Sequence, residues 1–109
     1  MKYSVIPSEK FKKEVKRLVK KYPSIKNELK ELGSLLEDEP KSGTQLGGHF
    51  FKIRLAIKSK GKGKSGGARV ITYLVAENRE IYLLTIYDKS EFDSVDDRTL
   101  QRIVEDLDW

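Results

Sequence analysis

The chain has 109 residues, a net charge of +5, no cysteine and a single histidine, His49. This composition excludes disulfides and thiolate metal sites and leaves too few ligands for zinc, so we expect neither a metal nor another cofactor. No apolar run approaches the ~20 residues of a membrane-spanning helix, and residues 1–7 do not resemble a secretory leader, so we expect one soluble cytoplasmic domain over residues 1–109, with no membrane partner.

The first third of the sequence predicts a short strand followed by two helices. Residues 2–6 can form a strand that ends at Pro7, and Ser8 can cap the next helix by accepting a backbone N–H. Apolar residues then recur at helical spacing in two stretches separated by Pro23 and Ser24. The two stripes are Phe11, Val15, Leu18, Val19 and Tyr22, and then Ile25, Leu29, Leu32 and Leu36. Because the join is short, we expect an antiparallel helical hairpin.

The apolar period changes to two after residue 48. Residues 39–48 are rich in Pro, Gly, Ser and Thr and predict a loop. Residues 49–57 alternate, as expected for a half-buried strand, and residues 68–76 and 81–87 predict two further strands. Apolar spacing from Ser94 onward predicts a C-terminal helix. The order βααβββα indicates the α+β class, with an antiparallel sheet backed by helices.

Positive charge is concentrated in the middle of the chain. Residues 40–76 contain eight Lys and Arg and no Asp or Glu, whereas residues 88–109 contain three Lys and Arg against eight Asp and Glu. Such asymmetry indicates a polyanionic partner. Within this block, residues 58–67 read KSKGKGKSGG, where Gly lets the backbone approach a phosphate and Lys neutralises it. We expect this loop to bind nucleic acid through Lys58, Lys60, Lys62 and Lys64.

A second group of cations is predicted to meet on the sheet. Lys52 and Arg54 are two residues apart on a strand, so they point to the face opposite Phe51, Ile53 and Leu55. If neighbouring strands form hairpins, Arg69, Tyr87 and Lys89 can converge on the same face. Because like charges repel, such a cluster indicates a polyanion bound between them.

Three segments carry a family resemblance. Residues 51–54 (FKIR), 67–73 (GARVITY) and 83–91 (LLTIYDKSE) resemble the RelE superfamily of bacterial toxins, and the basic stretch 60–67 is similar to its HigB branch. The resemblance implies a curved antiparallel sheet of about four strands, packed by the N-terminal helical hairpin, with a C-terminal helix. It also implies cleavage of mRNA in the ribosomal A site and neutralisation by a cognate antitoxin protein.

The resemblance also implies roles for individual residues. It places Lys52, Arg54 and Arg69 at RNA-contacting or catalytic positions and Lys89 at the end of the last strand. Ser90 stands where RelE has an arginine, and the late tyrosine of RelE has no clear counterpart, which leaves Tyr87 as the nearest candidate for an acid.

RNA cleavage of this kind needs no metal, because the 2′-OH is the nucleophile. Arg54 and Arg69 suit the phosphate, since guanidinium groups stay charged and bind it through two hydrogen bonds. Lys52 or Lys89 is the candidate base, because neighbouring positive charge favours the neutral amine.

Other functions remain open from the sequence. A ParE-like toxin has the same fold but targets DNA gyrase. An RNA-binding module without catalysis would use the same cations for affinity alone. A degenerate toxin would fold and bind its antitoxin without cutting RNA.

Overall fold

The computed structural model describes residues 2–60, 67–91 and 95–107. Its elements follow in the order β1 (Ser4–Pro7), α1 (Glu9–Lys21), α2 (Ile25–Asp38), β2 (Thr44–Gly47), β3 (Phe50–Leu55), the 3₁₀ turn η1 (Lys58–Lys60), β4 (Ala68–Val75), the 3₁₀ turn η3 (Ala76–Asn78), β5 (Glu80–Asp88) and α3 (Asp97–Glu105). None of the described helices is long and apolar enough to cross a membrane.

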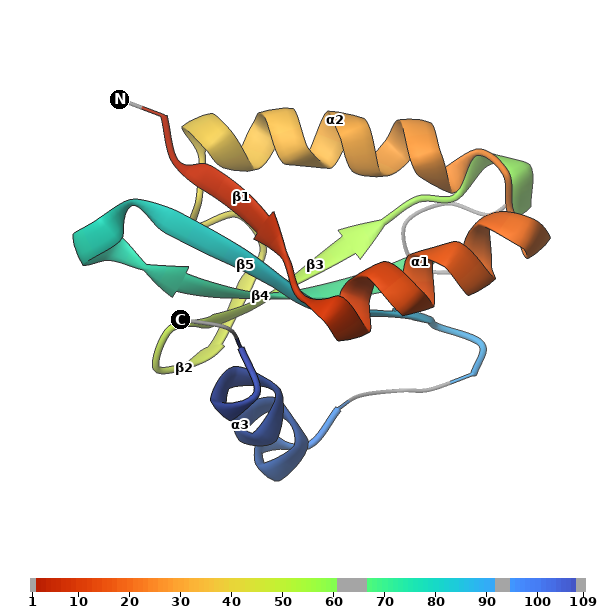
Figure 1. Cartoon of the computed structure of the whole chain (residues 1–109). Helices are drawn as coiled ribbons and strands as arrows, with labels where there is room; N and C mark the ends of the chain where they lie inside the picture. The colour runs from red at the N-terminus through yellow and green to blue at the C-terminus, as the bar shows by residue number, and fades with distance from the viewer. Residues whose placement is uncertain (1, 61–66, 92–94, 108–109) are drawn as a thin grey trace.

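The strands form one sheet in the order β1-β5-β4-β3-β2 (Figure 1). β2 to β5 pair antiparallel with their neighbours, and β1 is parallel to β5. The predicted α+β class, the helical hairpin and the C-terminal helix are confirmed. The direction of β1 was not predicted, because a strand of four residues carries no signal for its partner.

β2 lies within residues 39–48, where the sequence predicts a loop. All four of its residues are exposed, so it has no apolar alternation that would reveal a strand. It is held by its ladder with β3 and by a tight turn in which Gly47 and Gly48 both have positive φ, +133° and +53°. Glycine adopts such angles without steric cost, and this permits the reversal.

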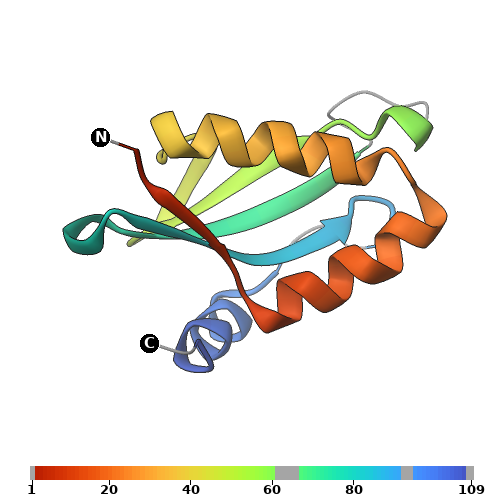
Figure 2. The ribbon, with the colours of Figure 1, turned by 45° about the horizontal axis from the view of Figure 1, so that its top comes forward.

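Helices cover both faces of the sheet. Figures 1 and 2 show α1 and α2 on one side and α3 on the other. The apolar stripes of α1 and α2 pack on the odd-numbered residues of β3, including Phe51, Ile53 and Leu55, as the alternation predicts. On the opposite face, Leu100 and Ile103 of α3 pack against Leu84, Tyr87 and their neighbours. The face that carries Lys52 and Arg54 is therefore the one that α3 shares.

Ser8 connects the end of β1 to the start of α1. Its hydroxyl accepts the backbone N–H of Phe11 at 3.0 Å, as predicted for a cap, and it donates to the carbonyl of Leu84 at 2.9 Å. Its own N–H donates to the carbonyl of Leu83 at 2.9 Å. Since β1 ends at Pro7, Ser8 provides the next hydrogen bonds to the edge of β5, immediately before α1 begins.

Candidate functional site

Three of the predicted site residues form a row across the sheet. Arg54 of β3 lies directly opposite Arg69 of β4, and Arg69 lies directly opposite Tyr87 of β5. Directly opposed residues of antiparallel strands share a face, with Cβ atoms about 5 Å apart. Lys52 lies one step along β3 on the same face, opposite Ile71. The predicted convergence of Lys52, Arg54, Arg69 and Tyr87 is therefore present in the fold.

A β-bulge in β5 places Tyr87 in this row. Ile71 pairs with Thr85 while Thr72 pairs with Leu83, so β5 contains one extra residue at this point. Before the bulge, Leu83 faces α1 and α2; after it, Tyr87 faces α3. Regular alternation from Leu83 would have put Tyr87 on the same side as Leu83, away from Arg69. The bulge therefore decides on which face the phenol lies.

The row is only partly open to solvent. The exposed fractions of Arg69 and Tyr87 are only 4% and 3%, whereas Arg54 is exposed and Lys52 is half-buried. Burial raises the pKa of the Tyr87 phenol, and the positive charge of Arg69 opposes that rise. This face is closed at Tyr87, where Leu100 and Ile103 of α3 pack in the same apolar cluster. The face stays open on β3, which leaves Arg54 as the accessible end of the row.

Lys89 follows the row at the end of β5, where a buried carboxylate fixes the backbone. Asp88 is fully buried; one carboxylate oxygen accepts the hydroxyl of Tyr22 at 3.0 Å, and the other accepts the N–H and hydroxyl of Ser90 at 2.9 and 2.8 Å. The N–H of Lys89 donates to the carbonyl of Gly67 at 3.0 Å. The half-buried Lys89 is thus held next to the beginning of β4. The sequence analysis did not single out Asp88, although an acid that ends an apolar strand is a signal for such a turn.

The first residues of the basic segment 58–67 are held in place by hydrogen bonds to the start of α2. The carboxylate of Glu28, 6% exposed, accepts the N–H of Lys58 at 2.6 Å, and Ser24 and Ser59 exchange hydrogen bonds, with 2.7 Å between their hydroxyl oxygens. These contacts tie η1 to the start of α2. Lys58 is exposed, and Lys60 is described only as part of η1. Lys62 and Lys64 lie outside the described residues.

Glu14 borders the site and was not predicted. One carboxylate oxygen accepts the Thr85 hydroxyl at 2.7 Å and the Ile86 N–H at 3.2 Å, and the other accepts Lys10 at 2.9 Å. Because β1 pairs with β5 only as far as Leu83, the Glu14 carboxylate supplies an acceptor for the N–H of Ile86 farther along this edge of β5. Glu14 follows Phe11 by three residues, just as Glu28 follows Ile25. An acid on the buried stripe of a helix is the signal that could have identified both carboxylates.

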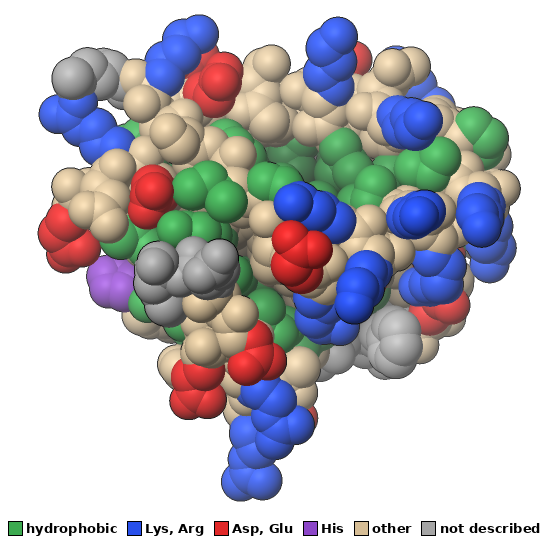
Figure 3. All heavy atoms as spheres, in the orientation of Figure 1, with side chains coloured by type: hydrophobic (Ala, Val, Ile, Leu, Met, Phe, Trp, Pro, Cys, Tyr) green, Lys and Arg blue, Asp and Glu red, His purple; other side chains and the backbone are tan. Residues whose placement is uncertain are grey.

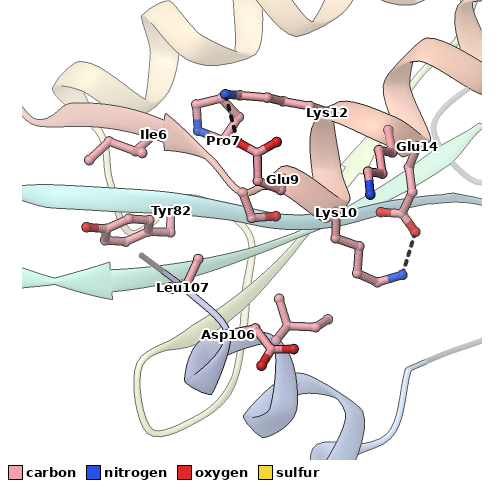
Figure 4. Close-up of a pocket in the computed structure, with 12 residues that line it drawn as sticks. Ile6, Pro7, Glu9, Lys10, Lys12, Glu14, Tyr82, Asp106 and Leu107 are labelled. Carbon is pink, nitrogen blue, oxygen red and sulfur yellow. Dashed lines mark hydrogen bonds and ion pairs between the residues drawn. The ribbon is translucent and has the colours of Figure 1, made fainter. Parts of the chain in front are cut away.

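Two cavities lie between α1 and α3. The smaller, about 280 Å³, is lined by Tyr87, Thr85, Glu14 and Lys10 together with Val95, Asp96 and Thr99. The larger, about 670 Å³, shares Lys10 and Glu14 with it and continues along α1 toward Asp106 and Leu107 (Figure 4). None of the predicted site residues lines the larger cavity. Only the smaller one reaches the row, at Tyr87.

The helices contribute further positive charge. Figure 3 shows Lys and Arg side chains gathered over the part of the surface that α1 forms. The exposed cations of this helix are Lys10, Lys12, Lys13, Lys16, Arg17, Lys20 and Lys21. Its ion pairs among the described residues are surface contacts, such as Lys12 with Glu9 at 3.3 Å, which contribute little to stability. The cations of α1 thus form a second positive surface, on the side of the sheet opposite to the face that carries Lys52 and Arg54.

Two comparisons relate the chain to known proteins. The family model described as "RelE toxin of RelE / RelB toxin-antitoxin system" matches residues 9–106. A solved structure of the E. coli toxin RelE, a mutant with two arginines replaced by alanine in the free state, matches with a TM-score of 0.61 at 15% identity, over 96% of this chain and 97% of that one. At this identity the structural match shows the fold. The family match covers most of the sequence, and the chain therefore belongs to the RelE toxin family.

Proposed function

We propose that the protein is the toxin of a toxin–antitoxin system and acts in the cytoplasm as an endoribonuclease on mRNA in the ribosomal A site. The observation that carries the proposal is the direct opposition of Arg54 and Arg69. Like charges in this position destabilise a sheet. No described carboxylate forms an ion pair with Arg54. A phosphate bound by the exposed Arg54 would reduce this repulsion, which supports a role for Arg54 in RNA binding.

The proposed reaction uses the RNA's own 2′-OH. Its oxygen attacks the adjacent phosphorus as Lys52 or Lys89 accepts its proton, and the bond to the 5′-oxygen breaks. The products are a 2′,3′-cyclic phosphate and a 5′-hydroxyl end. Arg54 contacts the phosphate, where a well-placed donor can contribute about 3 kcal/mol of transition-state stabilisation. Lys58 holds the RNA backbone farther along.

Arg69 and Tyr87 have a supporting place in this proposal. Both are buried, so neither is open to a phosphate in this structure. Arg69 adds positive potential behind Arg54 and holds the neighbouring guanidinium toward the surface by repulsion. A raised pKa keeps the Tyr87 phenol neutral and able to donate a hydrogen bond. The departing 5′-oxygen takes its proton from the solvent or from the second lysine.

The test is induced expression in bacteria, with growth measured and mRNA 5′ ends mapped with and without prior phosphorylation of 5′-hydroxyls. The wild type is compared with Arg54→Gln, which changes an exposed side chain, and with Arg98→Gln as a control for charge on α3. We expect growth arrest with new 5′-hydroxyl ends in register with codons. Arg54→Gln should lose both effects, and Arg98→Gln should keep them.

Other results would overturn the proposal in distinct ways. New 5′-phosphate ends would contradict attack by the 2′-OH. Arrest with intact mRNA and damaged DNA would indicate a gyrase-directed toxin. A folded protein that causes no arrest would indicate a binding module or an inactive toxin. The cognate antitoxin, coexpressed with the wild type, should restore growth.

A further inference from the structure

The ladder between β4 and β5 continues by one hydrogen bond beyond the ends of the two strands. Ala68 and Asp88 are the last directly opposed pair. The N–H of Lys89 then donates to the carbonyl of Gly67 at 3.0 Å. Successive residues of a strand alternate between the faces of the sheet, so Lys89 returns to the face of Tyr87, about 7 Å farther along. Lys89 thus follows the cationic row on its own side of the sheet.

Asp88 lies on the opposite face. It is directly opposed to Ala68, which belongs to the core that α1 and α2 cover, and it is fully buried. Its carboxylate accepts hydrogen bonds from the hydroxyl of Tyr22 at 3.0 Å and from the N–H and hydroxyl of Ser90 at 2.9 and 2.8 Å. The sheet separates this carboxylate from any RNA bound at the cationic row, so Asp88 does not contact the substrate.

Two contacts attach the turn of residues 88–91 to the end of α1. Tyr22 is the C-cap residue of this helix and packs against the core with its ring, while its hydroxyl bonds Asp88. Arg17, in the same helix, forms an ion pair with Glu91 at 3.6 Å. The turn that carries Lys89 is therefore held by a helix packed in the core.

The buried carboxylate exceeds what the turn itself requires. Burial of a carboxylate costs free energy that hydrogen bonds have to offset. A serine or threonine hydroxyl can bond the backbone of such a turn by itself. Asp88 has a second oxygen, and this oxygen connects the turn to Tyr22. The connection to α1, rather than the turn alone, accounts for a buried carboxylate at this place.

We propose that Asp88 and Tyr22 are positioning residues for Lys89 in RNA cleavage and that Lys89 accepts the proton of the 2′-OH. This inference rests on the proposed function. Lysine has a flexible four-carbon stem, so its amine stays within reach of the 2′-OH only if its backbone is held in place. The contact between Asp88 and Tyr22 holds that backbone from the far side of the sheet. The 2′-oxygen bonds to phosphorus, its proton passes to the Lys89 amine, and the 5′-oxygen departs.

The experiment measures single-turnover cleavage of mRNA on programmed ribosomes by the full chain at increasing toxin concentration. The maximal rate and the half-saturating concentration are thereby obtained separately. Tyr22→Phe removes only the hydroxyl and should lower the maximal rate about 10- to 100-fold. The half-saturating concentration should stay unchanged, because a misplaced base affects the transition state and not binding.

Tyr82→Phe is the matched control. The hydroxyl of Tyr82 also bonds a carboxylate, that of Glu80 at 3.1 Å, but at the opposite end of β5. Removing this hydroxyl should leave the maximal rate at the wild-type value. An equal loss in Tyr22→Phe and Tyr82→Phe would overturn the inference.

Two further comparisons separate positioning from a general structural role. Asp88→Asn keeps an oxygen for Ser90 and an amide that can bond the Tyr22 oxygen, so it should retain most of the rate that Asp88→Ala loses. Lys89→Met removes the base, and adding Tyr22→Phe to it should lower the residual rate no further, because Tyr22 acts through Lys89. Urea denaturation checks that each variant is folded, and if Asp88→Ala is not, the Tyr22 variants decide.

The contrary results are distinct. Undiminished cleavage by Lys89→Met would overturn the inference and leave the nuclease standing with another base. An additional loss from Tyr22→Phe in the Lys89→Met background would show that Tyr22 acts on more than Lys89. Asp88→Asn as slow as Asp88→Ala would assign the effect to charge instead of position. A wild type that cleaves no mRNA on the ribosome would overturn the proposed function, and this inference with it.

Discussion

Arg54 and Arg69 face each other across β3 and β4, so the sheet holds two positive side chains in a directly opposed pair. Directly opposed like charges destabilise a sheet, by roughly 0.2–1 kcal/mol. We expect Arg54→Gln to leave the free energy of unfolding unchanged or raise it within that range, and to abolish RNA cleavage. Urea denaturation and a cleavage assay on the same preparation measure both. A large loss of stability would mean that Arg54 is needed for folding, and its loss of activity would then say nothing about catalysis.

The ionisation of Tyr87 should report on Arg69. Burial raises the pKa of this phenol above its ordinary value of 10.0, and Arg69 lowers it. Replacing Arg69 by Gln removes the opposing charge, so the pKa should rise further. The stability due to the neutral phenol is present in full below pH 10.0 and is lost as the pH rises from there through the raised pKa.

Ultraviolet titration of the phenolate measures this pKa, and Tyr87→Phe identifies the signal. Tyr82→Phe is a necessary second reference, because burial and a hydrogen bond to Glu80 also raise the pKa of Tyr82. A lower Tyr87 pKa in Arg69→Gln would contradict the arrangement described for the row.

Glu14 should matter for stability far more than its position on a charged helix suggests. Glu14→Ala leaves the Thr85 hydroxyl and the Ile86 N–H without this acceptor, at an expected cost of about 1–3 kcal/mol. Glu9→Ala, in the same helix with 83% of its side chain exposed, should change the free energy of unfolding by less than ~0.5 kcal/mol. Chemical denaturation of the two variants tests the difference, and equal effects would refute it.

Two glycines should respond to alanine in opposite directions. Gly33 lies in the interior of α2 with no heavy atom within 4 Å of an added Cβ, so Gly33→Ala should stabilise by about 0.5–1 kcal/mol. At Gly67 an added Cβ would meet the carbonyl of Leu55, which lies in the neighbouring strand. Gly67→Ala should therefore destabilise by at least ~1 kcal/mol. Thermal melts of both variants give the signs.

Asp96 should make α3 sensitive to acid. Its carboxylate accepts the N–H of Thr99 at 2.8 Å, and hydrogen bonding from Thr99 lowers its pKa below the ordinary 3.8. A lowered pKa stabilises the helix above the ordinary value, and this contribution is lost as the pH falls through the lowered value. Amide exchange in residues 97–105 should therefore accelerate at acidic pH. Asp96→Asn keeps a capping oxygen without that ionisation, so its α3 should lack this component of the pH dependence.

The sequence predicts those helices and strands in which buried residues recur at a regular spacing. It does not predict features that depend on contacts with distant parts of the chain. The stripe through Phe11 and Leu18 and the alternation of Phe51 and Ile53 identify α1 and β3 because each buries one face. β2 buries nothing, so no pattern marks it.

The candidate site divides in the same way. The shared face of Lys52 and Arg54 follows from spacing alone. The burial of Tyr87 depends on where α3 packs, and the face on which Tyr87 lies depends on the bulge. Neither is encoded in a local period. The roles of Glu14 and Glu28 were missed because the surrounding charges conceal an acid on a buried stripe.

The extra residue in β5 also affects how this strand can vary in length. Between Leu83 and Ile86 two residues occupy the space that one would fill in a regular strand. We expect a deletion of Thr85 to straighten the strand and still leave Tyr87 beside Arg69. Elsewhere in β5 a one-residue deletion would exchange its two faces. The bulge thus gives a central strand one position at which a residue can be deleted. The deletion would remove the hydrogen bond from Thr85 to Glu14 of α1 and leave the cationic row intact.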